Sequence, residues 1–164
     1  KFQNHENTAD LAGELQSPVA GDPPPPELQA IADCCNKAVD CDSEHKGKGC
    51  RSRGVHKHSC CDKAIKRRKE KGDWNNVEPE ASHPETRTMD ACRLDVQIKT
   101  NGRTSRIYDF KFNCTKKPTM SQAQIDKYAT RFRGAIVEPI GSQGAKKAPP
   151  SKAACEGAPK SADC

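Results

Sequence analysis

The sequence predicts an α+β domain, in which helices flank a small mixed β-sheet and a cysteine-rich helical part comes first. Three observations predict this class. Residues 92–112 form two runs of alternating apolar and polar residues around Asn-Gly, which is the strongest short-range signal for a β-hairpin. Apolar residues recur at helical spacing before and after this hairpin. Six cysteines fall within residues 34–61, where they can cross-link neighbouring helices.

The two ends of the chain differ in composition from its middle. Residues 1–26 are polar and end in four consecutive prolines, which favour polyproline II and indicate a linker. Residues 141–164 consist mainly of Gly, Ala, Pro, Ser and Lys, which is typical of a low-complexity tail. We therefore expect one folded domain within residues 27–140 of the 164-residue chain.

The cysteine-rich part, residues 27–72, is predicted to contain two helices. The first begins at Pro26, and Leu28, Ile31, Cys35 and Val39 then follow at helical spacing. The second is expected to begin at Ser59, a candidate N-cap, and to end at Gly72.

Two segments are predicted to lack regular structure. Residues 42–58 are rich in glycine, basic residues and histidine and are expected to form a loop. Residues 75–90 contain two prolines and are expected to be irregular.

A third helix is predicted after the hairpin. It begins at Thr119 or Ser121, has Tyr128 among its periodic apolar residues, and ends at Gly134. Residues 135–140 are a candidate for a last short strand.

The cysteine cluster has several interpretations. Zinc sites usually contain cysteine pairs separated by two to four residues, and the cluster has no such pair. Disulfide bonds between the two helices explain the spacing better than a zinc site or free thiols, and they imply an oxidising environment. Sequence alone leaves the pairing open. The candidates are Cys34, Cys35, Cys41, Cys50, Cys60 and Cys61.

Charge and hydropathy limit the partners. The formal net charge of +6 favours an anionic partner such as nucleic acid, an acidic protein or a membrane surface. No stretch approaches the ~20 apolar residues of a membrane span.

The hairpin carries the residues with the clearest chemistry. Side chains two residues apart share one face of a strand, so Asp109 and Lys111 project together, opposite Tyr108 and Phe110. Asp95 lies on the first strand of the hairpin. Carboxylate pairs suit Mg²⁺ or Mn²⁺, and a lysine beside them can orient or deprotonate a water molecule. A solvated polar face of an ordinary amphipathic hairpin is the alternative.

The pattern Asp95…Asp109-Phe110-Lys111 resembles the D…(D/E)-x-K motif of the PD-(D/E)XK nuclease superfamily, which has the restriction-endonuclease fold. Together with Gln124 and Tyr128 on the following helix, residues 92–134 resemble VRR-NUC-type and related restriction-endonuclease-like toxin domains of bacterial polymorphic and type VI secretion effectors. The motif acid is Asp109, where these toxin domains more often have Glu.

The resemblance implies a restriction-endonuclease-like core and a metal-dependent DNA endonuclease with little sequence specificity. Asp95, Asp109 and the backbone carbonyl of Phe110 would bind Mg²⁺ or Mn²⁺. Lys111 would position or activate the attacking water, and Gln124 would orient that water, Lys111 or a phosphate. The resemblance also implies an upstream glutamate, for which the candidates are Glu70, Glu78, Glu80 and Glu85, with Glu78 preferred.

The resemblance further implies partners and a place of action. The chain would be a secreted antibacterial effector, with a delivery module N-terminal to residue 1, and would act on DNA in the cytoplasm of a target bacterium. An acidic immunity protein would protect the producing cell. Basic residues would contact the DNA backbone. The candidates are Arg67 and Arg68 within the basic run 66–71, Arg93, Arg103, Arg106, Lys116 and Lys117.

The register of the hairpin tests this interpretation. A two-residue turn without a bulge would pair Asp95 with Tyr108, so that Asp95 and Asp109 point to opposite faces. A shared site therefore requires an odd-length loop or a bulge within residues 99–106. A three-residue loop would achieve this by pairing Asp95 with Ile107.

Two other functions remain open. The cysteine content also suits a secreted, disulfide-rich binding or antimicrobial protein without catalysis. The Cys/His cluster at residues 34–61 would alternatively suit a zinc-binding nucleic-acid module.

Overall fold

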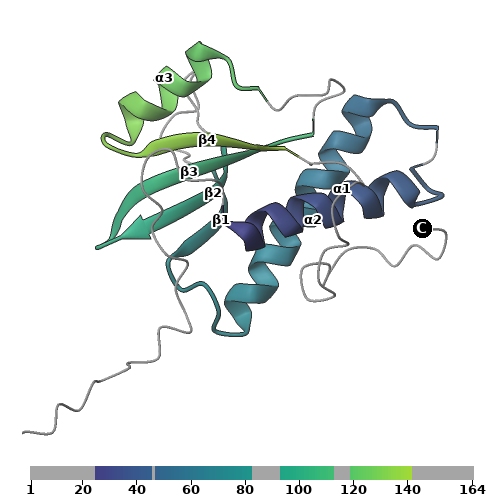
Figure 1. The fold of residues 1–164 in the computed structure, drawn as a ribbon, viewed down its shortest axis with the longest axis horizontal. Helices are drawn as coiled ribbons and strands as arrows, with labels where there is room; N and C mark the ends of the chain where they lie inside the picture. Colours follow the sequence, from purple (N-terminus) through teal and green to yellow (C-terminus); the bar gives the residue numbers. More distant parts are fainter. Residues whose placement is uncertain (1–24, 46, 83–92, 113–118, 142–164) are drawn as a thin grey trace, which may run out of the picture.

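A computed structural model shows the fold of the chain and describes residues 25–45, 47–82, 93–112 and 119–141 (Figure 1). Apart from residues 25, 26 and 141, the expected linker and tail lie outside the described residues. The predicted α+β class is confirmed. The elements are α1 (Pro26–Cys41), α2 (Cys50–Glu70), β1 (Val77–Ser82), β2 (Arg93–Thr100), β3 (Arg103–Lys111), α3 (Gln122–Arg131) and β4 (Ile136–Gly141).

The four strands form one mixed sheet in the order β1-β2-β3-β4. The β1–β2 and β2–β3 pairs are antiparallel, and the β3–β4 pair is parallel. Strand β4 confirms the predicted last strand, whereas β1 lies in a segment that we expected to be irregular. Pro79 interrupts the sequence signal of β1, but proline is tolerated there because β1 is an edge strand.

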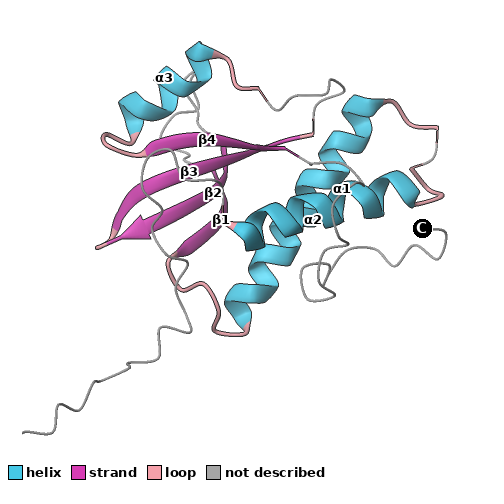
Figure 2. Cartoon of the chain, viewed as in Figure 1, coloured by secondary structure: helices cyan, strands magenta, loops and turns pink. Residues whose placement is uncertain are grey.

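The helices cover both faces of the sheet (Figure 2). Residues of α1 and α2, such as Leu28 and Ile65, pack with Tyr108 and Phe110 of β3 in the main apolar cluster. A smaller cluster on the other face joins Tyr128 of α3 to residues of β2 and β3. Strand β3 is therefore covered from both sides. No helix in the described part of the chain is long and apolar enough to cross a bilayer.

Helix α2 is longer than the sequence predicts, because it begins at Cys50 and includes part of the expected loop 42–58. Contacts with α1 stabilise this extra part. The Lys57 ammonium group is buried and lies 2.7 Å from Asn36 Oδ1 and 2.8 Å from Asp40 Oδ1. Arg53 donates to the same Asp40 oxygen at 3.0 Å. These long-range contacts override the weak local helix propensity of the segment.

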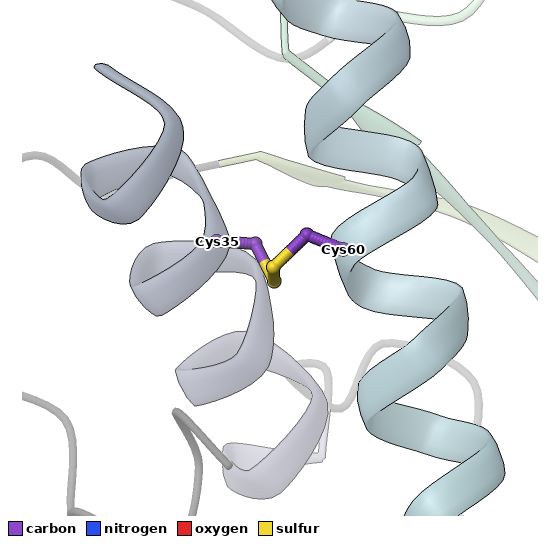
Figure 3. The surroundings of a disulfide bond; sticks show 2 residues. All are labelled: Cys35 and Cys60. Carbon is purple, nitrogen blue, oxygen red and sulfur yellow. A yellow bond between two sulfur atoms is a disulfide. The ribbon is translucent and has the colours of Figure 1, made fainter. Parts of the chain in front are cut away.

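A disulfide bond between Cys35 and Cys60 joins α1 to α2 (Figure 3). Cys34, Cys41 and Cys50 are also disulfide-bonded, so these sulfurs cannot serve as thiolate ligands of zinc. Cys61 is a buried free thiol. Burial, together with the nearby Asp95 and Asp62, raises the pKa of this thiol well above its usual value. The prediction that the cysteines staple the two helices is thus confirmed.

The hairpin has both a two-residue turn and a bulge. Asn101 and Gly102 have φ angles of 52° and 76°, as a type I′ turn requires, and Thr100 pairs with Arg103. Lys99 pairs with Thr104, but Ile98 pairs with Arg106, so Ser105 is an extra residue in β3. The predicted bulge within residues 99–106 is confirmed.

The predicted pairing of Asp95 with Ile107 is wrong, because Gln97 pairs with Ile107 and Val96 pairs with Tyr108. Asp95 is the next residue along β2, beyond the last paired residues, and a continued register would place it opposite Asp109. The extra residue lies in the second strand instead of the loop, so the register shifts by one residue in the opposite direction. Either shift, if continued, would turn Asp95 to the face of Asp109; in the structure the pairing ends at Val96, and the Asp95 carboxylate accepts from the Phe110 amide of β3.

Candidate active site

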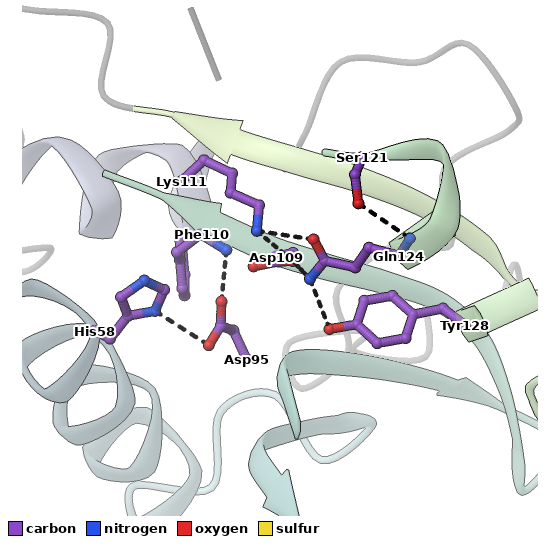
Figure 4. A network of polar contacts seen from close by, with 8 residues as sticks. All are labelled: His58, Asp95, Asp109, Phe110, Lys111, Ser121, Gln124 and Tyr128. Carbon is purple, nitrogen blue, oxygen red and sulfur yellow. Dashed lines mark hydrogen bonds and ion pairs between the residues drawn. The ribbon is translucent and has the colours of Figure 1, made fainter. Parts of the chain in front are cut away.

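Asp95 and Asp109 meet where the pairing of β2 with β3 ends (Figure 4). Val96 and Tyr108 are the last paired residues. Beyond them, the Phe110 amide donates a hydrogen bond to Asp95 Oδ2 at 2.7 Å. Because the N–H and C=O groups of one strand residue point the same way, the Phe110 carbonyl also faces this side of β3. Two carboxylates and a backbone carbonyl thus lie at the end of the paired segment.

Lys111 and Gln124 form a network around Asp109. Lys111 Nζ lies 2.8 Å from Asp109 Oδ2, and it donates to Gln124 Oε1 at 3.2 Å. Gln124 Nε2 donates to the same Asp109 oxygen at 2.6 Å and to the Tyr128 hydroxyl at 3.0 Å. Ser121 caps α3 by accepting from the Gln124 backbone amide, which fixes the start of the helix that carries Gln124. The four side chains predicted from the hairpin and third helix therefore lie in one site.

The two carboxyl groups differ in their acidity. Burial raises the pKa of Asp109 to about 6, opposed by a hydrogen bond from Lys111 and assisted by the negative charge of Asp95. Burial also acts to raise the pKa of Asp95, but hydrogen bonds from His58, Asp109 and the Phe110 amide and the charge of His58 outweigh it, so this pKa is lowered. The two buried carboxylates repel each other, and a cation bound between them would relieve this repulsion.

Helix α2 contributes two polar residues that the sequence analysis missed. His58 Nδ1 lies 3.1 Å from Asp95 Oδ1. Asp62 follows one helical turn later, and both residues line a pocket of about 510 Å³ together with Asp95, Asp109 and Gln124. We call this space the acidic pocket. The spacing of four residues between His58 and Asp62 indicates a shared helix face, but we expected helix α2 to begin only at Ser59.

The donor set of the acidic pocket fits a hard divalent cation. Mg²⁺ is commonly held by one or two carboxylates and keeps several water ligands. Asp95 and Asp109 supply this pair, and Asp62 Oδ1 is buried without a hydrogen-bond partner in the same pocket. The residues described by the structure contain no group of three or more His, Cys, Asp or Glu side chains that could hold a metal ion on their own. The arrangement therefore fits a water-rich magnesium or manganese site and not a closed cage of protein ligands.

The structure does not bring Glu78 to the acidic pocket. Glu78 forms ion pairs with Lys69 at 3.0 Å and Lys99 at 3.9 Å on the far side of β2 from β3. Of the other candidates for the upstream glutamate, Glu70 is exposed at the end of α2, Glu80 is a residue of β1, and Glu85 lies outside the described residues.

The predicted phosphate-contacting residues lie in different surroundings. Arg106 is buried and donates to Glu138 Oε2 at 2.6 Å, so the structure places it in the interior and not on a DNA-facing surface. The reason is the strand alternation, which puts Arg106 on the side of Tyr108 and Phe110.

Among the remaining basic candidates, Arg67 and Arg103 are exposed. Arg68 forms an ion pair with Asp73 at 3.7 Å. Arg93 begins β2, and Lys116 and Lys117 lie outside the described residues.

The arrangement can hold a cation, orient a water molecule beside it and stabilise added negative charge. The sequence predicted Asp95, Asp109, Lys111 and Gln124, and the structure adds His58 and Asp62. Comparison with known proteins gives no match, since no family model, curated protein or solved structure is significantly similar to the chain.

Proposed function

We propose that this chain is a metal-dependent nuclease with a restriction-endonuclease-like core, which hydrolyses DNA phosphodiester bonds with little sequence specificity. The observation that carries the proposal is the meeting of Asp95 and Asp109 where the pairing of β2 with β3 ends, with Lys111 2.8 Å from Asp109. A mixed sheet with helices on both faces also agrees with the architecture that the sequence resemblance implies.

The residues in and beside the acidic pocket have different roles in the proposed hydrolysis. Asp95, Asp109 and the Phe110 carbonyl would hold Mg²⁺ or Mn²⁺, which when bound polarises the scissile phosphate and stabilises charge on the leaving oxygen. Lys111 is held between Asp109 and Gln124, so its ammonium group can position the attacking water at a fixed place.

His58 and Gln124 act through the carboxylates. His58 fixes the orientation of Asp95 through the 3.1 Å contact between Nδ1 and Oδ1. Gln124 ties Asp109 to Tyr128 of α3, which couples the position of the carboxylate to the packing of that helix. Both are positioning residues in this proposal.

The charge of the molecule supports an anionic substrate and an acidic inhibitor. The net charge of +6 favours association with the phosphate backbone, and exposed residues such as Arg67 and Arg103 are suited to contacts that do not read sequence. As part of the proposal, the chain is a secreted antibacterial effector that meets an acidic immunity protein in the producing cell. Disulfide bonds suit a protein that passes through an oxidising space.

The test is cleavage of supercoiled plasmid and of circular single-stranded DNA with Mg²⁺, with Mn²⁺ and with EDTA. We expect cleavage with either metal, none with EDTA, and a loss of about 100-fold or more for Lys111→Ala, because the water loses its positioning cation. Lys63→Ala, which removes an exposed lysine from α2, is the matched control and should cleave at the wild-type rate.

Five of the six cysteines that the structure describes are in disulfide bonds, which favours a second candidate, a secreted binding protein without catalysis. This candidate predicts no cleavage by wild type with any divalent metal. Wild-type rates in Lys111→Ala would also count against the nuclease site.

A further inference from the structure

A second pocket of about 340 Å³ adjoins the acidic pocket, and we call it the side pocket. It lies between the first half of α2 and the end of β3. Val55 and His58 line both pockets, so the two spaces share a wall. The volume is in the range of sites that bind small molecules or single chemical groups. His58, Phe110 and Lys111, which have roles in the proposed hydrolysis, also line this pocket, whereas Arg51, Gly54 and Phe112 have none.

The walls of the side pocket are largely aromatic. The rings of Phe110 and Phe112 are stacked at 6.1 Å, and the His58 ring meets Phe112 edge-on at 5.3 Å. Val55, at the wall shared with the acidic pocket, is 66% exposed. It is the only large hydrophobic side chain that is exposed among the described residues. Phe110 is buried and Phe112 partly buried, so Val55 is the part of this apolar surface that is open to solvent. Such a surface is suited to a flat and poorly hydrated group.

The two pockets have opposite charge. Asp62, Asp95 and Asp109 line the acidic pocket. Arg51 and Lys111 line the side pocket, but the Lys111 ammonium group lies 2.8 Å from Asp109, so Arg51 supplies the positive charge of this pocket. No carboxylate is among its described lining residues. The side pocket is therefore complementary to a ligand that combines a flat apolar part with a negative charge. A nucleotide has both, namely a base and a phosphate.

Gly54 leaves the side pocket open. It lies in the interior of α2, where a glycine destabilises a helix by about 1 kcal/mol relative to alanine. The backbone does not require a glycine here, because a Cβ would meet only the Phe112 carbonyl oxygen at 4.0 Å, an ordinary contact. The absence of a side chain at this position leaves room in the side pocket.

We propose that the side pocket binds one unpaired nucleobase of the substrate, next to the phosphate that is cut. This inference rests on the proposed nuclease function and names its substrate class as DNA with unpaired bases. A base inside a duplex is stacked and paired, so it can enter a pocket only after it leaves the stack, which costs free energy. The base lies between Val55 and the Phe112 side of the pocket, and Arg51 contacts its phosphate.

The first test measures binding without cleavage. The ligand is a short single-stranded DNA that contains 2-aminopurine, and the protein carries Asp109→Asn to prevent hydrolysis. We expect tighter binding of this strand than of the blunt duplex of the same sequence, or of a strand whose central nucleotides lack bases. Each difference should be about tenfold or more, the size of one base–aromatic contact.

The pocket is then filled by Gly54→Leu, which improves helix propensity and should leave the melting temperature at or above the parent value. We expect this variant to lose about tenfold in affinity for the strand with bases and nothing for the strand without them. Gly54→Ala should have a smaller effect. Ser52→Leu, which adds the same side chain at an exposed position of α2 outside the pocket, should bind like the parent.

The second test repeats the comparison as cleavage rates with Mn²⁺, in the background with Asp109 intact. Equal rates and affinities of Gly54→Leu and wild type would overturn the base subsite and leave the nuclease function standing. Base-dependent binding that Gly54→Leu abolishes, with no cleavage of any DNA, would contradict the nuclease and support the subsite. Binding of all DNA that is insensitive to Gly54→Leu would overturn the inference.

Discussion

The two faces of β3 contact different kinds of groups, although their residues alternate along one strand. On one face, Tyr108 and Phe110 are buried against α1 and α2 in the main apolar cluster. On the other face, Asp109 and Lys111 meet Gln124 of α3 and the carboxylate of Asp95. The first face gains stability from burial, whereas the second holds two carboxylates together at a cost in stability.

The difference between the two faces of β3 explains how the site can be rigid. Apolar packing behind the strand fixes the backbone of β3, so the charged groups in front cannot move apart to relieve their repulsion. An apolar face that fixes the strand and a charged face that holds two carboxylates close together should produce a preorganised cation site. Substitutions on the two faces should therefore affect different quantities, stability on the apolar face and cleavage on the charged face.

The largest effect is expected for Asp109→Asn. It removes one of the two carboxylates that would hold the metal, so plasmid cleavage should fall by about a thousandfold. Gel assays over a range of protein concentrations measure this loss. Asp126→Asn, at an exposed carboxylate of α3, is the matched control and should cleave like wild type. Similar rates for both variants would remove Asp109 from the site.

On the apolar face, Tyr108→Ala should lower the free energy of unfolding by about 3–5 kcal/mol, because it empties a fully buried position in the main cluster. Urea denaturation followed by circular dichroism measures this change. Tyr108→Phe keeps the ring and loses only the hydroxyl that accepts from Arg106, so it should cost about 1 kcal/mol. Equal stability of Tyr108→Ala and wild type would contradict the assignment of this face to the core.

The Cys35–Cys60 disulfide bond joins α1 to α2, the two helices that pack on the apolar face of β3. Replacement of both Cys35 and Cys60 by alanine should cost about 3 kcal/mol, the value for a loop of this length. At 25 °C the remaining folded protein should cleave DNA at an undiminished rate per folded molecule. Thermal melting and cleavage, measured on the same samples, test both statements. A variant that melts normally but has lost cleavage would show that the disulfide serves the charged face instead.

The hairpin and the helices α1 and α3 could be predicted from sequence because their sequence signals are local. Asn101-Gly102 supports a type I′ turn, and Ser121 caps α3. The first half of α2 could not be predicted, because it is stabilised by contacts with α1. These are ion pairs with Asp40 and the disulfide bond between Cys60 and Cys35. Strand β1 was not predicted because it contains Pro79, and proline is rare inside a sheet. The strand forms nevertheless, because an edge strand tolerates proline.

The candidate site shows the same division between local and long-range signals. Asp109, Lys111 and Gln124 follow from alternation in a strand and from the next helix along the chain. His58 and Asp62 reach the pocket only because α2 packs beside the end of the hairpin, which no local pattern encodes. The register of Asp95 depended on where the extra residue lies, and nothing in the sequence distinguished a bulge at Ser105 from a longer loop.

The smallest effect concerns pH. The pKa of Asp109 is raised to about 6 in the folded chain, so its neutral form stabilises the fold. This contribution is fully present below about pH 4 and is lost as the pH rises through about 6, and it changes by about 2 kcal/mol between pH 4.5 and pH 7.5. Urea midpoints in EDTA should therefore fall between pH 4.5 and pH 7.5 for wild type and stay flatter for Asp109→Asn. A midpoint that rises equally in both proteins would contradict the raised pKa.

The most direct test of the charged face is a calorimetric titration of Mn²⁺ into the metal-free chain at pH 7.5. The account predicts one binding site in wild type, which is lost in Asp95→Asn and in Asp109→Asn and retained in Asp126→Asn. Unchanged Mn²⁺ binding in the first two variants, or no binding in wild type, would contradict the claim that the bulge at Ser105 brings two carboxylates together to hold a metal ion.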